Sequence, residues 1–228
     1  WINKALERAQ QKVEARNFDI RKTLIKFDNV LNDQRHVIFS QRKNAMNSDQ
    51  IFSYSEEFLE EIINDLLKLK TLKMSDPKNK DFENKLRMVV GKNLSNEGIN
   101  KLINSKDKDL KIEIFKKFKE TRNERIKLLG EQQSKEIEKR IFLQSIDLNW
   151  KSHIQYLEQL RQVIGLRSYG QRDPLVEYKK EAFELFSNLL EKLKLDYVTI
   201  LMNLKVVVET NQNDENNKED ISKQIPKN

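Results

Sequence analysis

Hydrophobic residues recur every three or four positions along most of this chain, a spacing that predicts amphipathic α-helices. Residues 1–46 contain no glycine or proline. We therefore expect one long helix there, about 65 Å in length at about 1.5 Å per residue. Its apolar stripe is predicted to comprise Ile2, Leu6, Ala9, Val13, Ile20, Leu24, Phe27, Leu31 and Ile38.

Several apolar residues of this helix lie off the stripe. They are Phe18, Val30, Val37 and Phe39. A coiled-coil arm needs only one apolar seam, so the additional aromatic residues favour a scaffold that serves several neighbours at once. An ordinary coiled-coil arm remains the alternative. We expect Phe18, Val30 and Phe39 to lack partners within this chain.

The middle of the chain, residues 47–130, is predicted to be a small helical domain. A polar break precedes Ser53, and the run from Ser53 to Glu56 fits a capping box at the start of a helix that continues to about Lys73. Shorter helices are expected over residues 82–90 and 96–103, where glycines separate them. No catalytic pattern occurs in this region.

The last part of the chain predicts two helices joined by a short loop. A helical pattern runs from about Lys108, with a joint expected at Gly130, and continues to Ile164. The run Asp173-Pro174 then restarts a helix, because Asp is a favoured N-cap and proline suits the first helical position. Two apolar stripes joined in this way should pack as an antiparallel hairpin. The second stripe comprises Leu175, Phe183, Phe186, Leu190, Leu193, Tyr197, Leu201 and Leu204.

The predicted fold class is therefore all-α, in four segments. These are a long helix over residues 1–46, a helical domain over 47–130, a helical hairpin over 131–208, and a disordered polar tail over 209–228. The composition agrees, because only 5 glycines and 3 prolines interrupt 228 residues. No apolar run approaches the roughly 18 residues of a membrane span. The first residues resemble no signal peptide, and the absence of an initiator methionine suggests a fragment.

The net charge of +7 admits nucleic acid, anionic lipid or an acidic protein as a partner. It also fits a lysine-rich solvated surface, because 36 acidic residues are mixed among 43 basic ones. The mixture dilutes any field of one sign, so charge alone favours the solvated surface.

The sequence contains partial signatures of a phosphate-binding loop and of a metal site, but both are incomplete. Gly165 and Gly170 have the glycine spacing of a phosphate-binding loop, but Gln171 and Arg172 stand where Lys and Ser or Thr are needed. His36 and His153 are far apart in sequence, and the chain has no cysteine. We therefore expect no catalytic, cofactor or metal site in this chain.

Two stretches resemble SecA, the motor family of bacterial preprotein export. The first comprises residues 9–22 (AQQKVEARNFDIRK) and 27–35 (FDNVLNDQR). The second comprises residues 143–153 (LQSIDLNWKSH), 160–162 (LRQ), 165–174 (GLRSYGQRDP) and 177–179 (EYK). Their order and separation also match the family, and together they cover a little under half of the chain.

The resemblance implies that 1–46 is the long helix of the helical scaffold domain and that 47–130 is the helical wing domain. Residues 131–208 would form the two-helix finger, whose tip enters the cytoplasmic mouth of the SecYEG channel. The fingertip would contact channel and substrate through Arg167, Tyr169, Gln171 and Arg172. The scaffold helix would meet the absent motor domains through Asn17, Phe18, Asp19, Arg21, Asp28, Asp33 and Arg35.

The same resemblance implies partners and a location. The partners are SecYEG, unfolded preproteins, the nucleotide-binding domains of the same protein, and acidic phospholipid, while nucleic acid is disfavoured. The protein would be cytoplasmic and peripheral at the inner face of the bacterial plasma membrane. ATP and magnesium belong to the full-length parent, a protein-translocating ATPase whose motor folds are absent from this chain.

Two other functions compete with this reading. One is a basic helical adaptor that binds nucleic acid through the lysines between residues 106 and 127. Acidic residues interrupt that run, and Phe115 and Phe118 suit a core better than a phosphate-facing surface. The other is a purely structural coiled-coil spacer.

Overall fold

The structure is a computed structural model that describes residues 1–47, 50–75, 79–91, 94–166 and 172–206. Within these residues the fold is all-α, with no strand, as the sequence predicted. None of the helices there combines the length and apolar character that a membrane span requires. The tail predicted to be disordered, 209–228, lies outside the described residues. The helices are α1 (Ile2–Asn47), α2 (Ile51–Ser75), α3 (Asp81–Val90), α4 (Asn96–Asn104), α5 (Asp107–Leu129), α6 (Glu131–Ile164) and α7 (Pro174–Asn203).

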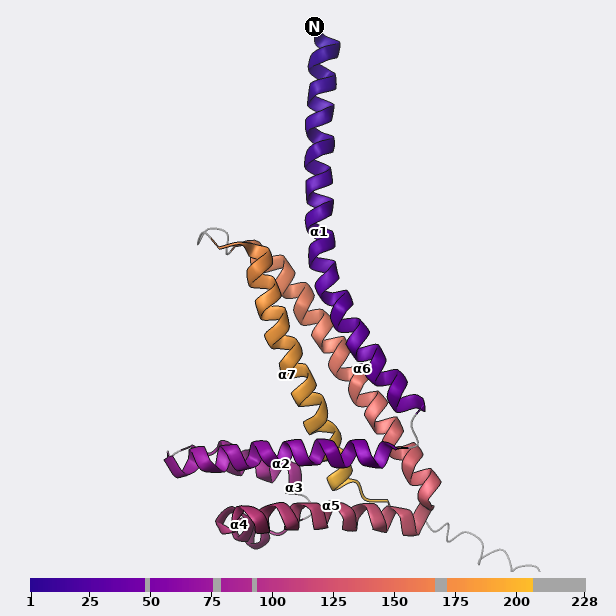
Figure 1. The fold of residues 1–228 in the computed structure, drawn as a ribbon, viewed down its shortest axis with the longest axis vertical. Helices are drawn as coiled ribbons and strands as arrows, with labels where there is room; N and C mark the ends of the chain where they lie inside the picture. The colour runs from indigo at the N-terminus through magenta and orange to yellow at the C-terminus, as the bar shows by residue number, and fades with distance from the viewer. Residues whose placement is uncertain (48–49, 76–78, 92–93, 167–171, 207–228) are drawn as a thin grey trace, which may run out of the picture.

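The helices α6 and α7 form the predicted antiparallel hairpin (Figure 1). The second half of α1 lies along this hairpin and contacts both of its helices. The first half of α1 continues past the end of the hairpin and projects away from the rest of the chain (Figure 1). At the opposite end, α2 and α5 run across the base of the hairpin (Figure 1).

Local signals in the sequence explain where several helices begin and end. The Asp173 carboxylate accepts a hydrogen bond from the Leu175 backbone N–H (2.8 Å) and Pro174 occupies the first turn, so the predicted start of α7 is confirmed. Gly130 is the single residue between α5 and α6. Its φ of 85° lies in a region that favours glycine, which explains the joint expected there.

One hydrophobic core joins the base of the hairpin to the middle of the chain. Its buried residues come from the end of α1 and from α2 through α7. Residues 47–130 therefore share a core with α6 and α7, and the break at Gly130 separates two helices rather than two cores. A smaller cluster lies further along the hairpin, where Phe27, Val30 and Leu31 of α1 pack against Leu157, Ile164, Tyr178 and Ala182.

Three local expectations were wrong. No capping box forms at Ser53, because α2 already begins at Ile51 and the Ser53 hydroxyl donates to Glu57 instead. Val30 was expected to lack a partner, but it packs in the smaller cluster because α1 lies on the hairpin there. Phe183 was assigned to the packing stripe of the hairpin, yet its side chain is 72% exposed.

Candidate functional site

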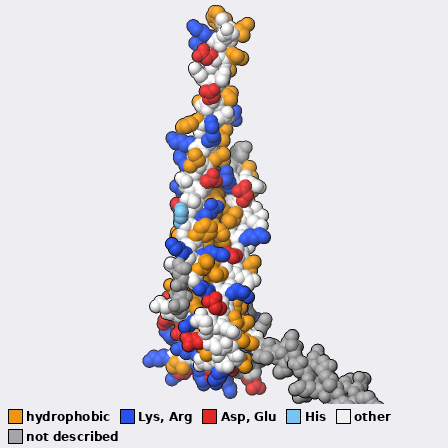
Figure 2. All heavy atoms as spheres, turned by 90° about the vertical axis from the view of Figure 1, so that its right-hand side faces the viewer, with side chains coloured by type: hydrophobic (Ala, Val, Ile, Leu, Met, Phe, Trp, Pro, Cys, Tyr) orange, Lys and Arg blue, Asp and Glu red, His pale blue; other side chains and the backbone are white. Residues whose placement is uncertain are grey.

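The projecting end of α1 carries an uncovered apolar face. We call residues 2–25 the arm. Figure 2 shows hydrophobic side chains at intervals along this projection, with charged groups among them. The exposed apolar residues include Ile2 (83%), Leu6 (68%), Val13 (57%) and Ile20 (47%). An exposed apolar face of this length is a candidate contact surface for another protein segment.

The uncovered face is continuous with a covered one. At 3.6 residues per turn, Leu6, Val13 and Ile20 lie on the same side of α1 as Phe27 and Gln34. Phe27 is partly buried, Gln34 is buried, and both face the hairpin. The same stripe therefore packs against α6 and α7 in one half of α1 and lacks a partner within the described residues in the other half.

The opposite side of the arm is apolar at two positions. Phe18 is 61% exposed and Ile25, one heptad further along, is 58% exposed. The positions lie about half a turn from the main stripe, so the arm has two apolar faces. Phe39, also predicted to lack a partner, is 53% exposed. Apolar groups on two faces agree with the predicted scaffold, because a single coiled-coil seam would need only one.

The residues of α1 predicted to meet the motor domains differ in their contacts within this chain. Asp28 has a partner within the chain, because Arg161 Nη1 of α6 lies 3.0 Å from its carboxylate. Arg21 donates to the Asn17 carbonyl (3.3 Å) one turn earlier in α1. All seven predicted residues have exposed side chains: Asn17, Phe18, Asp19, Arg21, Asp28, Asp33 and Arg35.

A buried polar layer fixes α1 on the hairpin. The Gln34 amide nitrogen donates to the Ala182 carbonyl of α7 (3.0 Å), and its oxygen lies 2.7 Å from His153 Nε2 of α6. Burial lowers the pKa of the His153 imidazole to about 4 from 6.5. A neutral imidazole that donates from Nε2 satisfies the Gln34 oxygen, so one side chain of α1 is bonded to both hairpin helices.

Further contacts on either side of this layer hold the same helices together. The rings of Phe27 and Tyr178 meet edge to face, with centroids 4.8 Å apart. Burial raises the pKa of the Tyr178 hydroxyl, although the nearby Arg161 guanidinium acts in the opposite direction. Arg42 of α1 forms an ion pair with Asp147 of α6 nearer the base. The second half of α1 and the hairpin are therefore joined at several levels.

Most of the predicted fingertip lies outside the described residues. This applies to Arg167, Tyr169 and Gln171. Arg172 is described, and its guanidinium lies 3.3 Å from the Glu177 carboxylate in the first turn of α7. The Arg172 side chain is 67% exposed, so this local ion pair leaves it accessible.

Sequence reasoning missed two pairs of exposed apolar residues on the hairpin itself. On α7, Val176 is 60% exposed and Phe183, seven residues later, is 72% exposed. On α6, Tyr156 and Val163 show the same spacing with exposures of 59% and 55%. The spacing of seven was the available signal, because it places each pair on one side of its helix.

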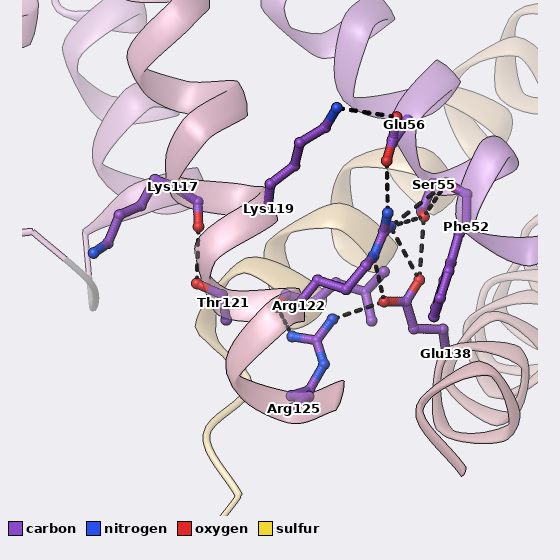
Figure 3. Close-up of polar contacts among 10 residues, drawn as sticks. Phe52, Ser55, Glu56, Lys117, Lys119, Thr121, Arg122, Arg125 and Glu138 are labelled. Carbon is purple, nitrogen blue, oxygen red and sulfur yellow. Dashed lines mark hydrogen bonds and ion pairs between the residues drawn. The ribbon is translucent and has the colours of Figure 1, made fainter. Parts of the chain in front are cut away.

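Sequence reasoning also missed a buried charged cluster at the base of the hairpin (Figure 3). Its centre is Glu138 of α6, whose side chain is fully buried. Its carboxylate accepts from Arg122 Nε (3.1 Å) and Arg125 Nη2 (2.7 Å), both of α5. Ser55 and Glu56 of α2 complete the group, since Arg122 donates to the Ser55 hydroxyl (2.5 Å) and to the Glu56 carboxylate (2.7 Å). We call these five residues the Glu138 cluster.

The described residues contain no group of three or more His, Asp and Glu side chains placed to hold a metal ion. Of the segment that has phosphate-loop spacing, only Gly165 and Leu166 are described, and they lie just after the end of α6. The candidate contact surfaces among the described residues are the arm and the exposed apolar positions of the hairpin.

Comparisons with known proteins point to one family. A family profile described as the SecA wing and scaffold domain matches residues 1–205. The protein translocase subunit SecA of Pelagibacter ubique is 68% identical over 212 residues, which are 93% of this chain and 25% of that protein. The subunits of Afipia carboxidovorans and Bartonella bacilliformis are each 40% identical over 210 residues, 91% of this chain. The chain spans about a quarter of the length of these curated relatives.

Proposed function

This chain belongs to the SecA family through its wing and scaffold domain, and we propose that it is the part of a protein translocase that transmits movement to the translocating polypeptide. The movement would come from ATP-driven domains of the longer protein. The substrate would be an unfolded preprotein in the SecYEG channel. ATP hydrolysis and magnesium binding are assigned to the longer protein and not to this chain.

The observation that carries the proposal is the course of α1. One continuous helix of 46 residues is bare at one end and seated on the hairpin at the other. A partner bound to the arm would move α1. The hydrogen bonds from Gln34 to Ala182 and His153 would then move α7 and α6 with it. The two apolar faces of the arm suit contacts with the missing domains of the same protein, which the relatives are long enough to supply.

The proposed contact with the substrate lies at the end of the hairpin. We assign it to Arg167, Tyr169, Gln171 and Arg172. A tyrosine has apolar area and a polar end, so it can hold varied sequences without selecting among them. Arginines beside it suit channel carboxylates or acidic phospholipid. This role places the longer protein in the cytoplasm, peripheral to the inner face of the plasma membrane.

The structure gives little support to the nucleic-acid alternative. Some of the lysines between residues 106 and 127 have acidic neighbours, with Lys111 bonded to Glu60 (2.6 Å) and Lys119 lying 3.8 Å from Glu56. Phe118 is buried in the core. A phosphate backbone would have to displace these carboxylates, which lowers the gain from each contact.

A cross-linking experiment tests the proposal. A photoreactive residue replaces Tyr169 in a full-length SecA that carries this segment, and a preprotein is stalled in a SecYEG channel. Cross-links to preprotein and channel are expected. The control position is Lys192, which is exposed in the half of α7 nearer the base. Equal cross-linking at both positions, or none at Tyr169, would refute the proposal.

A further inference from the structure

The joint between α5 and α6 has no connecting loop to set its angle. Gly130 alone separates the two helices, and nothing lies within 4 Å of where a Cβ would be. Figure 1 shows α5 running across the base while α6 rises from its end. A glycine at such a joint leaves the backbone free to adopt other angles. The angle must therefore be determined by contacts between the helices.

The Glu138 cluster lies across this joint. Arg122 precedes Gly130 by about two turns and Arg125 by less than two, and Glu138 follows Gly130 by about two turns. Hydrogen bonds of the cluster also extend to helices beyond the joint. Arg125 Nη1 donates to the Leu201 carbonyl of α7 (2.9 Å), and Arg122 reaches Ser55 and Glu56 of α2. Rotation of α5 about Gly130 would break these bonds together.

The chemistry of the cluster suits orientation better than net stability. Its two guanidinium groups and two carboxylates balance in charge, and the Glu138 carboxylate accepts bonds at both oxygens. The Arg122 guanidinium also lies over the rings of Phe52 (4.4 Å) and Phe118 (4.9 Å). Burying charges costs desolvation that their attraction roughly offsets, whereas hydrogen bonds depend on direction and apolar contacts do not.

We propose that Glu138 is a positioning residue that holds one angle between α5 and α6 at Gly130. It thereby fixes the orientation of residues 47–130 relative to the hairpin. Apolar packing supplies the stability of this region, and the charged cluster selects one packing among several of similar free energy. The inference does not depend on the translocation role.

Distance measurements between the two helices test the inference. The chain has no cysteine, so Lys116→Cys on α5 and Gln155→Cys on α6, both at exposed positions, allow a single pair of spin labels. The full chain is compared with a variant whose cluster is apolar, Arg122→Met, Arg125→Met and Glu138→Leu. The matched control is Lys111→Met with Glu60→Leu, which removes an exposed ion pair between α5 and α2.

The apolar variant is expected to keep its helical content and its melting temperature, because buried ion clusters are often replaced without loss of stability. Its label-to-label distances should spread over a broader distribution, while the control keeps the narrow one. An unchanged distribution in the folded apolar variant would overturn the inference. So would an unfolded apolar variant, since the cluster would then be required for folding itself rather than for orientation.

Discussion

Gln34 and His153 lie 119 positions apart in sequence and share a buried hydrogen bond of 2.7 Å between α1 and α6. The rings of Trp150 and Phe186 also contact the imidazole, with centroids 5.6 and 5.7 Å away. The surroundings of His153 are thus a neutral amide and two aromatic rings, which explains why burial dominates the shift of its pKa.

From the burial of His153 beside Gln34, we predict that the chain loses stability in mild acid. Burial lowers the pKa of His153 to about 4, below the value of about 6.5 for the unfolded chain. Between these values the unfolded state binds more protons, so the free energy of unfolding falls as the pH falls from about 6.5 to about 4. Allowing for partial solvent screening, the loss is about 2–3 kcal/mol. Urea unfolding at a series of pH values measures it.

The control for that prediction is His153→Gln, which keeps a hydrogen-bonding group and removes the titration. Carboxylates titrate in both proteins, so the difference between the two pH profiles isolates His153. The variant should lose less stability on acidification than the parent chain. Identical profiles would show that His153 is not held neutral in the fold.

Removing the centre of the Glu138 cluster should be costly. Glu138→Ala leaves the Arg122 and Arg125 guanidinium groups buried without their shared carboxylate. Breaking a buried ion pair in this way typically costs about 3–5 kcal/mol. The comparison is Glu60→Ala, whose exposed pair with Lys111 should be worth at most about 1 kcal/mol. Thermal or urea unfolding of both variants decides, and similar losses would contradict the prediction.

Local sequence signals predicted the helices well. The spacing of apolar residues, the joint at Gly130 and the N-cap at Asp173 depend on neighbours within a few positions, so one sequence can reveal them. The capping box failed because α2 begins two residues before Ser53, so Ser53 and Glu56 lie within the helix. Those signals describe the backbone, and they do not say which helices meet.

The Glu138 cluster could not be found in this way, because its members come from three helices. Between residues 134 and 145 of α6, the buried residues are Ser134, Glu138, Phe142 and Ser145. Three of these four residues are polar, so periodicity assigns that face to solvent. Only the approach of α2 and α5 turns it inward. Phe183 shows the opposite error. It was predicted to be buried because it is aromatic and lies on an apolar stripe, but no helix among the described residues covers it.

The arm should exchange its amide hydrogens faster than the rest of α1. Residues 2–25 have exposed side chains, whereas Gln34, Ile38 and Ala45 of the same helix are buried. A helix without tertiary packing is marginal in water, so its hydrogen bonds open often. Hydrogen–deuterium exchange followed by mass spectrometry compares peptides from the two halves. Uniform protection along α1 would mean that the arm is covered in solution.

The last prediction concerns Tyr169, which lies outside the described residues and is assigned to the fingertip by proposal. Tyr169→Ala in a full-length SecA that carries this segment should depress preprotein transport into vesicles and leave basal ATP hydrolysis intact. Its effect on stability should be about 0.5 kcal/mol or less, the usual size for a side chain that supports no core. Tyr169→Phe and Tyr169→Trp should retain more transport, because the aromatic surface survives.

The competing explanation is that Tyr169 only packs against its own loop. Tyr169→Ala would then lower the melting temperature of this chain, and transport would recover once folding is rescued. Transport by the full-length variant and the melting temperature of the 228-residue chain carrying the same substitution therefore separate the two roles. A normal melting temperature with impaired transport supports a contact with the substrate. A lowered melting temperature with normal transport at a permissive temperature assigns Tyr169 to the loop and removes it from the mechanism.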